Sequence, residues 1–378
     1  MKVEELILHK TPFYLYDLEV LENTLDTAKL NAEKHNYHIH YALKANTNDR
    51  ILKLIQEKGL GADCVSGNEV LKALEMGFSP TQIAFAGVGK SDEEILIGLE
   101  HDIFSFNCES IQEIEVINEI AEKQNKVAKI ALRLNPNVDA KTHKHITTGL
   151  EENKFGINGW ELESLVEQLP NFKNIEVTGL HFHIGSQITS MTPFKNLCIR
   201  VNEFNNWFLE RNIHIQHLNL GGGLGIDYQN PEESPIPDFE LFFGVFNQFL
   251  EPRPHQEIHF ELGRSLVGNC GSLISKVLYV KNGIKTNFVI LDAGMTELIR
   301  PALYQAYHHI ENLTSSSSSL EFYDVVGPIC ESSDCFGKKI ELQETKRGDY
   351  IKIHSTGAYG EVMASKYNLR EQNPVVYL

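Results

Sequence analysis

The chain has 378 residues, enough for two domains or for one large barrel with an appended domain. Its 51 acidic and 34 basic residues give a net charge of −17, which argues against nucleic-acid binding and against binding to a membrane surface. No early segment resembles a signal peptide, no stretch reaches transmembrane length, and the six cysteines lack zinc-ribbon spacing. We therefore expect a cytoplasmic protein with reduced cysteines, and we predict no metal site.

Short apolar runs alternate with longer amphipathic segments from about residue 38 onward. In segments such as 69–76 and 111–123, apolar residues recur every three or four positions, which is typical of helices. Ser66 and Glu69 have capping-box spacing before the first of these helices. Such alternation implies parallel strands, and eight repeats over roughly 250 residues favour a closed (β/α)8 TIM-type barrel. The expected strands are 38–43, 61–65, 83–86, 103–106, 129–134, 176–183, 217–220 and 257–261.

The pattern changes after Arg264. Segments 268–280, 287–292, 323–326 and 349–354 have the composition of strands, but no helices of comparable length lie between them. We therefore predict an α/β protein with the barrel at 23–265 and a second, β-rich domain formed by residues 1–22 and 266–378.

Lys44 is the first candidate for chemistry, because it stands at the end of an apolar strand in Tyr41-Ala42-Leu43-Lys44. Partial desolvation there would lower the pKa of the amine and favour Schiff-base chemistry, although most lysines at strand ends are simply solvated. In a TIM-type barrel, reactive groups gather at the C-terminal ends of the strands. The polar residues and glycines at those ends are Lys44, Asp63, Asn107, Arg133, Asn135, His183, Gly221-Gly222-Gly223 and Glu261.

Gly221-Gly222-Gly223-Leu224-Gly225 directly follows an expected strand. Four glycines in five positions let backbone amides approach an anion closely, so a phosphate-binding loop and an ordinary tight turn are both open. The segment has neither Walker nor dinucleotide-binding spacing.

His181 and His183 alternate on an expected strand and should point the same way. A metal site lacks further ligands at suitable spacing, so stacking on a flat cofactor ring and simple core packing remain as alternatives. Glu261 could face a pyridine nitrogen and keep it protonated, or it could form an ion pair with Arg264.

In the β-rich part, Cys330 could donate a proton, and the acidic residues after it could recognise a cation. Free cysteines are more often inert, so this signal is weak by itself. Arg300 and Tyr304 could clamp a carboxylate, since a guanidinium matches its geometry.

Taken together, these motifs resemble those of the fold-type III pyridoxal-phosphate (PLP) decarboxylases over nearly the whole chain. The motifs are Tyr-Ala-Leu-Lys-Ala-Asn at 41–46, His-Phe-His-Ile-Gly-Ser-Gln at 181–187, Gly-Gly-Gly-Leu-Gly at 221–225 and Cys-Glu-Ser-Ser-Asp at 330–334, in family order. One departure is visible: Leu262 stands where the family usually has proline in Glu-Pro-Gly-Arg.

The resemblance implies that Lys44 holds PLP as a Schiff base, that His183 stacks on its ring and that Glu261 contacts the pyridine nitrogen. It further implies that Cys330 is the general acid, supplied by the partner subunit of a homodimer. The remaining implied cofactor contacts are Asp63, Ser186, Gly222, Gly223 and Tyr359. The implied substrate contacts are Arg264, Arg300, Tyr304, Glu331, Ser332 and Tyr359.

Within the family, the motifs resemble those of members that convert meso-2,6-diaminopimelate to L-lysine and CO2, the last step of bacterial lysine synthesis. Arg264 and Arg300 suit a distal carboxylate, which ornithine and lysine lack. Rival functions are an ornithine, arginine or carboxynorspermidine decarboxylase, an alanine racemase, an inactive homologue and a barrel that binds another phosphorylated ligand. Glu261 argues against a racemase, which typically places arginine at the pyridine nitrogen.

Overall fold

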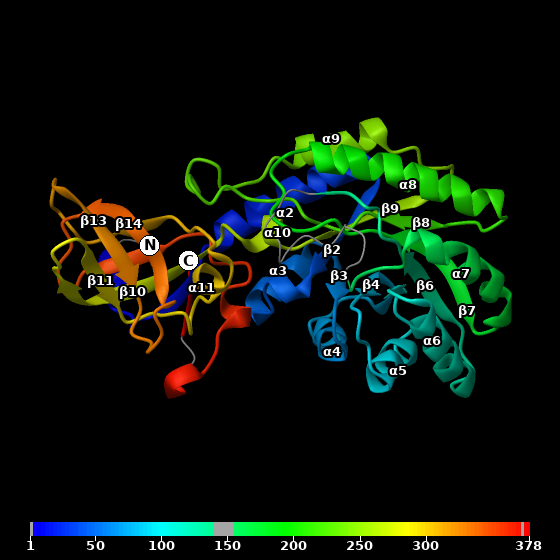
Figure 1. Cartoon of the computed structure of the whole chain (residues 1–378), viewed down its shortest axis with the longest axis horizontal. Coiled ribbons are helices and arrows are strands. Elements are labelled where there is room, and N and C mark those ends of the chain that lie inside the picture. The colour runs from blue at the N-terminus through cyan, green and yellow to red at the C-terminus, as the bar shows by residue number, and fades with distance from the viewer. Residues whose placement is uncertain (1–2, 140–153, 372–373) are drawn as a thin grey trace. The chain divides into compact units, whose positions relative to one another are not determined.

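The computed structural model describes residues 3–139, 154–371 and 374–378. The chain divides into two compact units (Figure 1). One unit comprises Leu25–Gly225 and Asp238–Gly263, and the other comprises Met1–Thr24, Ile226–Pro237 and Arg264–Leu378. Segment 226–237, which the sequence placed in the barrel domain, therefore groups with the second unit.

The first unit is a closed barrel of eight parallel strands, which confirms the predicted fold class. Its strands, in order around the barrel, are β2 (Tyr37–Ala42), β3 (Gly61–Cys64), β4 (Ile83–Phe85), β5 (Ser105–Cys108), β6 (Ala128–Arg133), β7 (Ile175–His181), β8 (His217–Asn219) and β9 (Glu257–Leu262). The helices on the chain between and before them are α2 (Leu18–Glu33), α3 (Asp49–Glu57), α4 (Gly67–Glu75), α5 (Asp92–Glu100), α6 (Ile111–Lys123), α7 (Leu162–Gln168), α8 (Thr192–Glu210) and α9 (Phe239–Phe249).

All eight expected strands overlap observed ones, with shifts at the ends. Strand β5 begins at Ser105, two residues later than expected, and the backbone N–H of Phe104 before it is shared between the carbonyl oxygens of Pro80 and Ile83. Strand β7 ends at His181, so His183 lies beyond the strand and not on it as predicted. Ser66 caps α4 through the backbone N–H of Glu69, at 3.2 Å, as the spacing predicted.

The second unit is built on a sheet with strand order β12-β15-β10-β11-β13-β14, and β1 pairs with both β10 and β16. These strands are β1 (Phe13–Tyr16), β10 (Gly271–Lys281), β11 (Asn287–Leu291), β12 (Ile310–Asn312), β13 (Leu320–Val326), β14 (Cys335–Gln343), β15 (Tyr350–Ile353) and β16 (Val375–Tyr377). Its short helices are α1 (Val3–Leu6), α10 (Arg264–Val267) and α11 (Arg300–Tyr304). Strand β14 was missed because Gly337 and a left-handed Lys339 interrupt its alternation and shift its register with β13.

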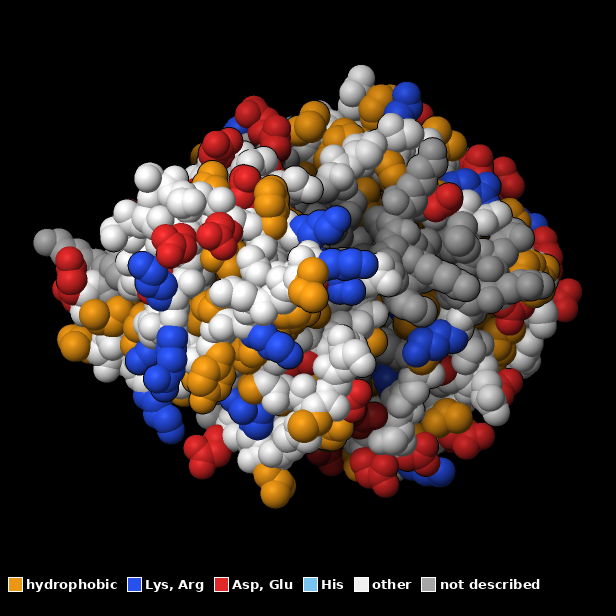
Figure 2. Space-filling model, turned by 60° about the vertical axis from the view of Figure 1, so that its left-hand side comes forward, with side chains coloured by type: hydrophobic (Ala, Val, Ile, Leu, Met, Phe, Trp, Pro, Cys, Tyr) orange, Lys and Arg blue, Asp and Glu red, His pale blue; other side chains and the backbone are white. Residues whose placement is uncertain are grey.

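No helix in the described ranges is long and apolar enough to cross a membrane. On the face shown in Figure 2, acidic and basic side chains are interspersed with hydrophobic and uncharged ones. The net charge of −17 is therefore not spread as a uniform acidic layer over that face.

The contact between α9 and β9 holds the last strand of the barrel in place. Phe260 is fully buried, and its ring lies 4.8 to 5.6 Å from the rings of Phe242, Phe243 and Phe246. Such aromatic clusters contribute both buried area and favourable edge-to-face geometry. Side chains alternate along a strand, so the outward position of Phe260 turns His259 and Glu261 into the barrel.

Replacing Phe260 with alanine should therefore destabilise the barrel by about 3–5 kcal/mol, the usual cost of truncating a buried aromatic side chain. Chemical denaturation followed by circular dichroism would measure this change. Val127→Ala is the matched control, since Val127 belongs to the same unit but is 57% exposed. Equal loss of stability in the two variants would show that this aromatic cluster does not hold β9.

Candidate active site

Lys44 lies just past the C-terminal end of β2, in a short 3-10 helix (Leu43–Ala45) whose two other residues are buried. Its side chain remains 37% exposed, and Nζ lies 3.0 Å from Oδ2 of Asp63 on the neighbouring strand β3. The Asp63 side chain is fully buried. The structure therefore brings the predicted Lys44 and Asp63 together, with the amine accessible and its partner carboxyl inside.

Burial raises the pKa of Asp63, and the nearby Glu261 raises it further, whereas the Lys44 ammonium opposes both effects. Oδ1 of Asp63 has no hydrogen-bond partner among the described residues. A buried polar atom without a partner is costly, so such an atom beside an accessible amine marks a place where a polar ligand group would be stabilised.

Glu261 stands on β9 and faces three donors from other strands of the barrel. Oε1 accepts hydrogen bonds from Nδ2 of Asn107 at 2.9 Å and from Nδ2 of Asn219 at 2.7 Å, and Oε2 lies 2.8 Å from Nε2 of His181. Burial alone would raise the pKa of Glu261, but His181, with smaller contributions from Lys44 and His183, holds it well below its usual range. Glu261 is therefore a fixed, buried negative charge.

The sequence analysis paired none of these three residues with Glu261, and it did not select Asn219 at all. Asn219 ends β8 and His181 ends β7, and both are buried polar residues at the ends of apolar strands. A polar residue at the end of an apolar strand was the signal that could have found Asn219, because the same signal selected Asn107. The predicted alternative of an ion pair with Arg264 is not needed to satisfy the carboxylate, because the barrel itself supplies three donors.

His183 and the glycine loop pack against each other. The backbone N–H of Gly222 lies 3.4 Å from Nδ1 of His183, and burial together with the nearby Arg133 lowers the pKa of His183 well below its usual value. A side chain at Gly222 would collide with the carbonyl oxygen of Glu261. Close backbone packing therefore explains why glycine is required at position 222.

Ser186 lies in the segment that runs beside this loop. Ile188 donates its N–H to the carbonyl oxygen of Gly223 at 2.8 Å, and a Cβ at Gly223, where φ is +111°, would lie 2.7 Å from the carbonyl oxygen of Gly185. The hydroxyl of Ser186 and the amides of the glycine loop are thus on adjacent segments of the barrel unit. Whether they hold a phosphate stays a prediction.

The predicted substrate residues lie in the second unit, where two arginines form a buried cluster. Arg264 and Arg300 are each 6% exposed. Arg264 donates a hydrogen bond to the hydroxyl of Tyr228 and lies 4.9 Å from the ring of Tyr359, and Arg300 lies 5.1 Å from the ring of Tyr228. Tyr228 was missed by the sequence analysis, because segment 226–237 interrupts the barrel pattern without a motif of its own.

Arg300 is also held by a neutral histidine. Nδ1 of His308 is 2.8 Å from the carbonyl oxygen of His354 and therefore carries the proton, which leaves Nε2 to accept a hydrogen bond from Arg300 at 2.8 Å. Burial and the Arg300 charge lower the pKa of His308 to about 3. The side chains of Tyr228, His308 and Tyr359 thus orient the two guanidiniums. None of these contacts is with a carboxylate, so they do not neutralise the positive charge of either guanidinium.

Cys330, Glu331 and Ser332 lie in the loop between β13 and β14, and all three are exposed. The carboxylate of Asp334 shapes this loop by accepting from the backbone N–H groups of Ile329 and Met295. Glu331 accepts a hydrogen bond from the hydroxyl of Tyr367 at 2.8 Å. Tyr304, at the end of α11, is half-buried.

Comparison with known proteins identifies the family of the barrel unit. The family profile described as "Pyridoxal-dependent decarboxylase, pyridoxal binding domain" matches residues 19–268. The chain belongs to this family. PLP is therefore its cofactor, as the resemblance implied.

This pyridoxal-dependent decarboxylase is 57% identical over 363 residues to a protein of Bacteroides thetaiotaomicron named diaminopimelate decarboxylase, covering 96% of this chain and 94% of that one. A protein of the same name from Aquifex aeolicus is 39% identical, over 95% of this chain and 84% of the other. Among solved structures, the diaminopimelate decarboxylase of Helicobacter pylori complexed with L-lysine has a TM-score of 0.93 and 40% identity, over 99% of this chain and 93% of that one.

The residues in the barrel unit fit the cofactor of the family. PLP needs an accessible amine for its aldehyde, a negative charge for its pyridine nitrogen and amides for its phosphate. Lys44 supplies the amine, Glu261 supplies the negative charge, and the glycine loop supplies backbone amides with no side chains to block them. The unpartnered Oδ1 of Asp63 offers one further acceptor.

Proposed function

We propose that the chain decarboxylates meso-2,6-diaminopimelate to L-lysine and CO2, the last step of lysine biosynthesis. The proposal depends above all on one observation: an accessible amine, Lys44, and a buried carboxylate, Glu261, held by Asn107, Asn219 and His181, stand at the same end of one barrel. The full-length similarity to proteins named diaminopimelate decarboxylase selects the substrate.

In this proposal, Lys44 holds PLP covalently through Nζ, and its ion pair with Asp63 positions the amine. His183 packs against the cofactor ring, while Ser186, Gly222, Gly223 and Tyr359 hold the phosphate. Bound PLP supplies an electron sink for the electron pair that the departing carboxylate leaves behind. Glu261 would keep a proton on the pyridine nitrogen, because a negatively charged carboxylate beside that nitrogen favours its protonated form.

Substrate recognition is assigned to the second unit. Arg264 and Arg300 bind substrate carboxylates, since a guanidinium offers parallel donors and both charges are already oriented by Tyr228 and His308. Tyr304 and Tyr359 complete the carboxylate site. Glu331 and Ser332 would recognise the distal amino-acid end, where a carboxylate side chain pairs with an ammonium group.

Cys330 is the proposed general acid, which delivers a proton to the carbon that has lost CO2. Its exposure in the single chain suits a residue that completes the site of a second subunit, so the proposal includes a homodimer. It also includes a cytoplasmic location.

Replacing Cys330 with alanine should lower kcat by about 10²–10⁴-fold, the usual contribution of a positioned acid, while PLP binding is retained. Steady-state kinetics and the absorbance of bound PLP would measure the two effects separately. Cys335→Ala is the matched control, since Cys335 is a half-buried thiol in β14 outside the proposed site. Full activity of the Cys330 variant would assign the proton to another group.

The proposed reaction is tested by incubating the PLP-loaded protein with meso-diaminopimelate and quantifying both products. Equal amounts of CO2 and L-lysine are the expected result. Failure to release CO2 from a protein that has bound one PLP per chain would refute the proposed function.

A further inference from the structure

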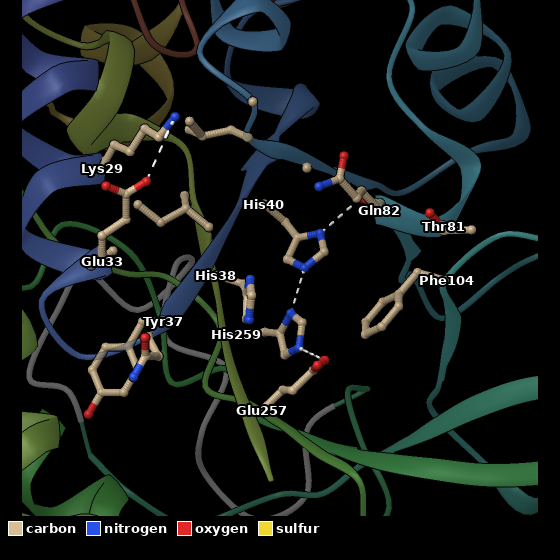
Figure 3. Close-up of a pocket in the computed structure, with 16 residues that line it drawn as sticks. Lys29, Glu33, Tyr37, His38, His40, Thr81, Gln82, Phe104, Glu257 and His259 are labelled. Atoms are coloured by element: carbon tan, nitrogen blue, oxygen red, sulfur yellow. Dashed lines mark hydrogen bonds and ion pairs between the residues drawn. The ribbon is translucent and has the colours of Figure 1, made fainter. Parts of the chain in front are cut away.

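The interior of the barrel contains histidines where apolar side chains are usual. TIM-type barrels fill their centre mainly with branched apolar residues. Here His40 from β2, His217 from β8 and His259 from β9 are all buried, and the ring of Phe104 lies 4.7 to 5.5 Å from each of them. A pocket of about 470 Å³ opens beside them, and its wall includes His38, His40, Gln82, Glu257 and His259 (Figure 3).

Hydrogen bonding fixes the proton positions in this cluster. Nδ1 of His40 lies 3.0 Å from the carbonyl oxygen of Gln82, which can only accept, so Nδ1 carries the proton. Nε2 of a neutral His40 is then a lone pair. It lies 2.8 Å from Nδ1 of His259, which must donate to it. The remaining nitrogen of a neutral His259, Nε2, is therefore also a bare lone pair.

This lone pair faces a carboxylate. Nε2 of His259 has no hydrogen-bond partner among the described residues and lies 3.5 Å from Oε2 of Glu257 (Figure 3). Two acceptors that face each other repel, and a proton or a metal cation between them removes the repulsion.

A metal cation meets the same need without protonating the ring. Two ligand atoms on a tetrahedral zinc ion, each about 2.1 Å from the metal, are about 3.4 Å apart, which matches the gap between His259 and Glu257. The chain from His259 through His40 to the Gln82 carbonyl is also the arrangement that orients metal-binding histidines, whose second nitrogen donates to a fixed acceptor.

We propose that His259 Nε2 and the Glu257 carboxylate bind a divalent transition-metal cation of the zinc class. His38, an exposed residue whose ring is stacked 4.9 Å from that of His259, can supply a third ligand by side-chain rotation, and water completes the shell. The sequence predicted no metal site: Glu257 and His259 alternate on β9, but a carboxylate and one histidine are too common a pair to indicate a metal, and His38 comes from β2 at the other end of the barrel sequence.

A second histidine–carboxylate cluster in the chain serves as the control. Glu232, Glu311 and His354 lie close together in the other unit, but Lys352 Nζ is 3.1 Å from Glu232 and 3.4 Å from Glu311. This ammonium already supplies the positive charge there. Glu311→Gln should therefore leave metal binding unchanged.

Calorimetric titration of the chelator-treated, PLP-loaded protein with zinc chloride tests the proposal. Wild type should bind one zinc ion per chain at this site, Glu257→Gln should weaken that binding at least tenfold, and His38→Ala should weaken it less. Zinc should also raise the Tm of wild type but not of Glu257→Gln. No saturable binding, or wild-type affinity in Glu257→Gln, would overturn the proposal. Glu257 is 61% exposed at its side chain, so this variant should fold normally.

Discussion

Lys44→Ala is expected to lose turnover by at least about a thousandfold, which corresponds to about 4 kcal/mol of transition-state stabilisation. The amine is the only group at this rim, among the described residues, that the proposal uses to hold PLP covalently. Borohydride treatment should fix the cofactor irreversibly to wild type but not to the variant, and mass spectrometry of the intact chain measures that difference without any substrate.

The alanine variant also leaves Asp63 buried without its partner, so lost activity could reflect a damaged barrel. Lys44→Arg separates the two effects, because it keeps a cation beside Asp63 but cannot form the covalent link. Lys53→Ala is the surface control: Lys53 lies on α3, where its exposed side chain contacts only Gln56, at 3.2 Å, and Glu57, at 3.7 Å, among the described residues. Wild-type turnover in Lys44→Arg would remove Lys44 from the mechanism.

Glu261→Gln is expected to lower kcat by about 10²–10³-fold with little change in KM, the signature of an interaction that matters most in the transition state. Glutamine has nearly the same shape but no charge, so it no longer favours a protonated pyridine nitrogen. The amide oxygen of glutamine can still accept from Asn107 and Asn219, but its NH2 group replaces the oxygen that faces His181. The exposed Glu119 gives the control variant Glu119→Gln.

The pH dependence provides an independent check on Glu261. Its pKa in the folded protein lies well below its usual value, so the carboxylate stays ionised as the pH falls through the range where an ordinary glutamate is protonated. Its contribution to stability is present above the unfolded-state pKa and is lost only as the pH falls through the depressed folded-state value. The free energy of unfolding of Glu261→Gln should lack this pH-dependent contribution. If the acid-unfolding curves of the variant and the wild type were the same, that would contradict the depressed pKa of Glu261.

The barrel was predictable because alternating strands and helices leave a strong pattern in the sequence. Lys44, Asp63, Asn107 and Glu261 were selected by one rule, that polar residues at the ends of barrel strands meet at one rim, and the structure joins Lys44 with Asp63 and Asn107 with Glu261. The pairing itself was not predictable, since Asn107 and Glu261 are 154 positions apart and spacing says nothing about such contacts.

Other features had no local signal at all. Tyr228 organises both arginines, but it lies in a segment that leaves the barrel and returns to it, and hydrophobic periodicity does not report such excursions. The histidines inside the barrel occupy positions that usually hold apolar side chains, so their protonation states emerge only from the hydrogen bonds that connect β2 to β9. Alternation along β9 places Glu257 and His259 on the same face, but the 3.5 Å distance between Nε2 of His259 and Oε2 of Glu257 is known only from the structure.

The measurement that tests the central claim most directly is CO2 release by the PLP-loaded protein when meso-diaminopimelate, L-ornithine, L-arginine and L-lysine are offered separately. We predict release from meso-diaminopimelate alone, because only this substrate presents a carboxylate and an ammonium group together at its distal end. Release from ornithine or arginine instead would keep the chemistry of Lys44 and Glu261 but contradict the roles given to Arg264 and Arg300. No release from any of the four, with PLP bound, would contradict the account as a whole.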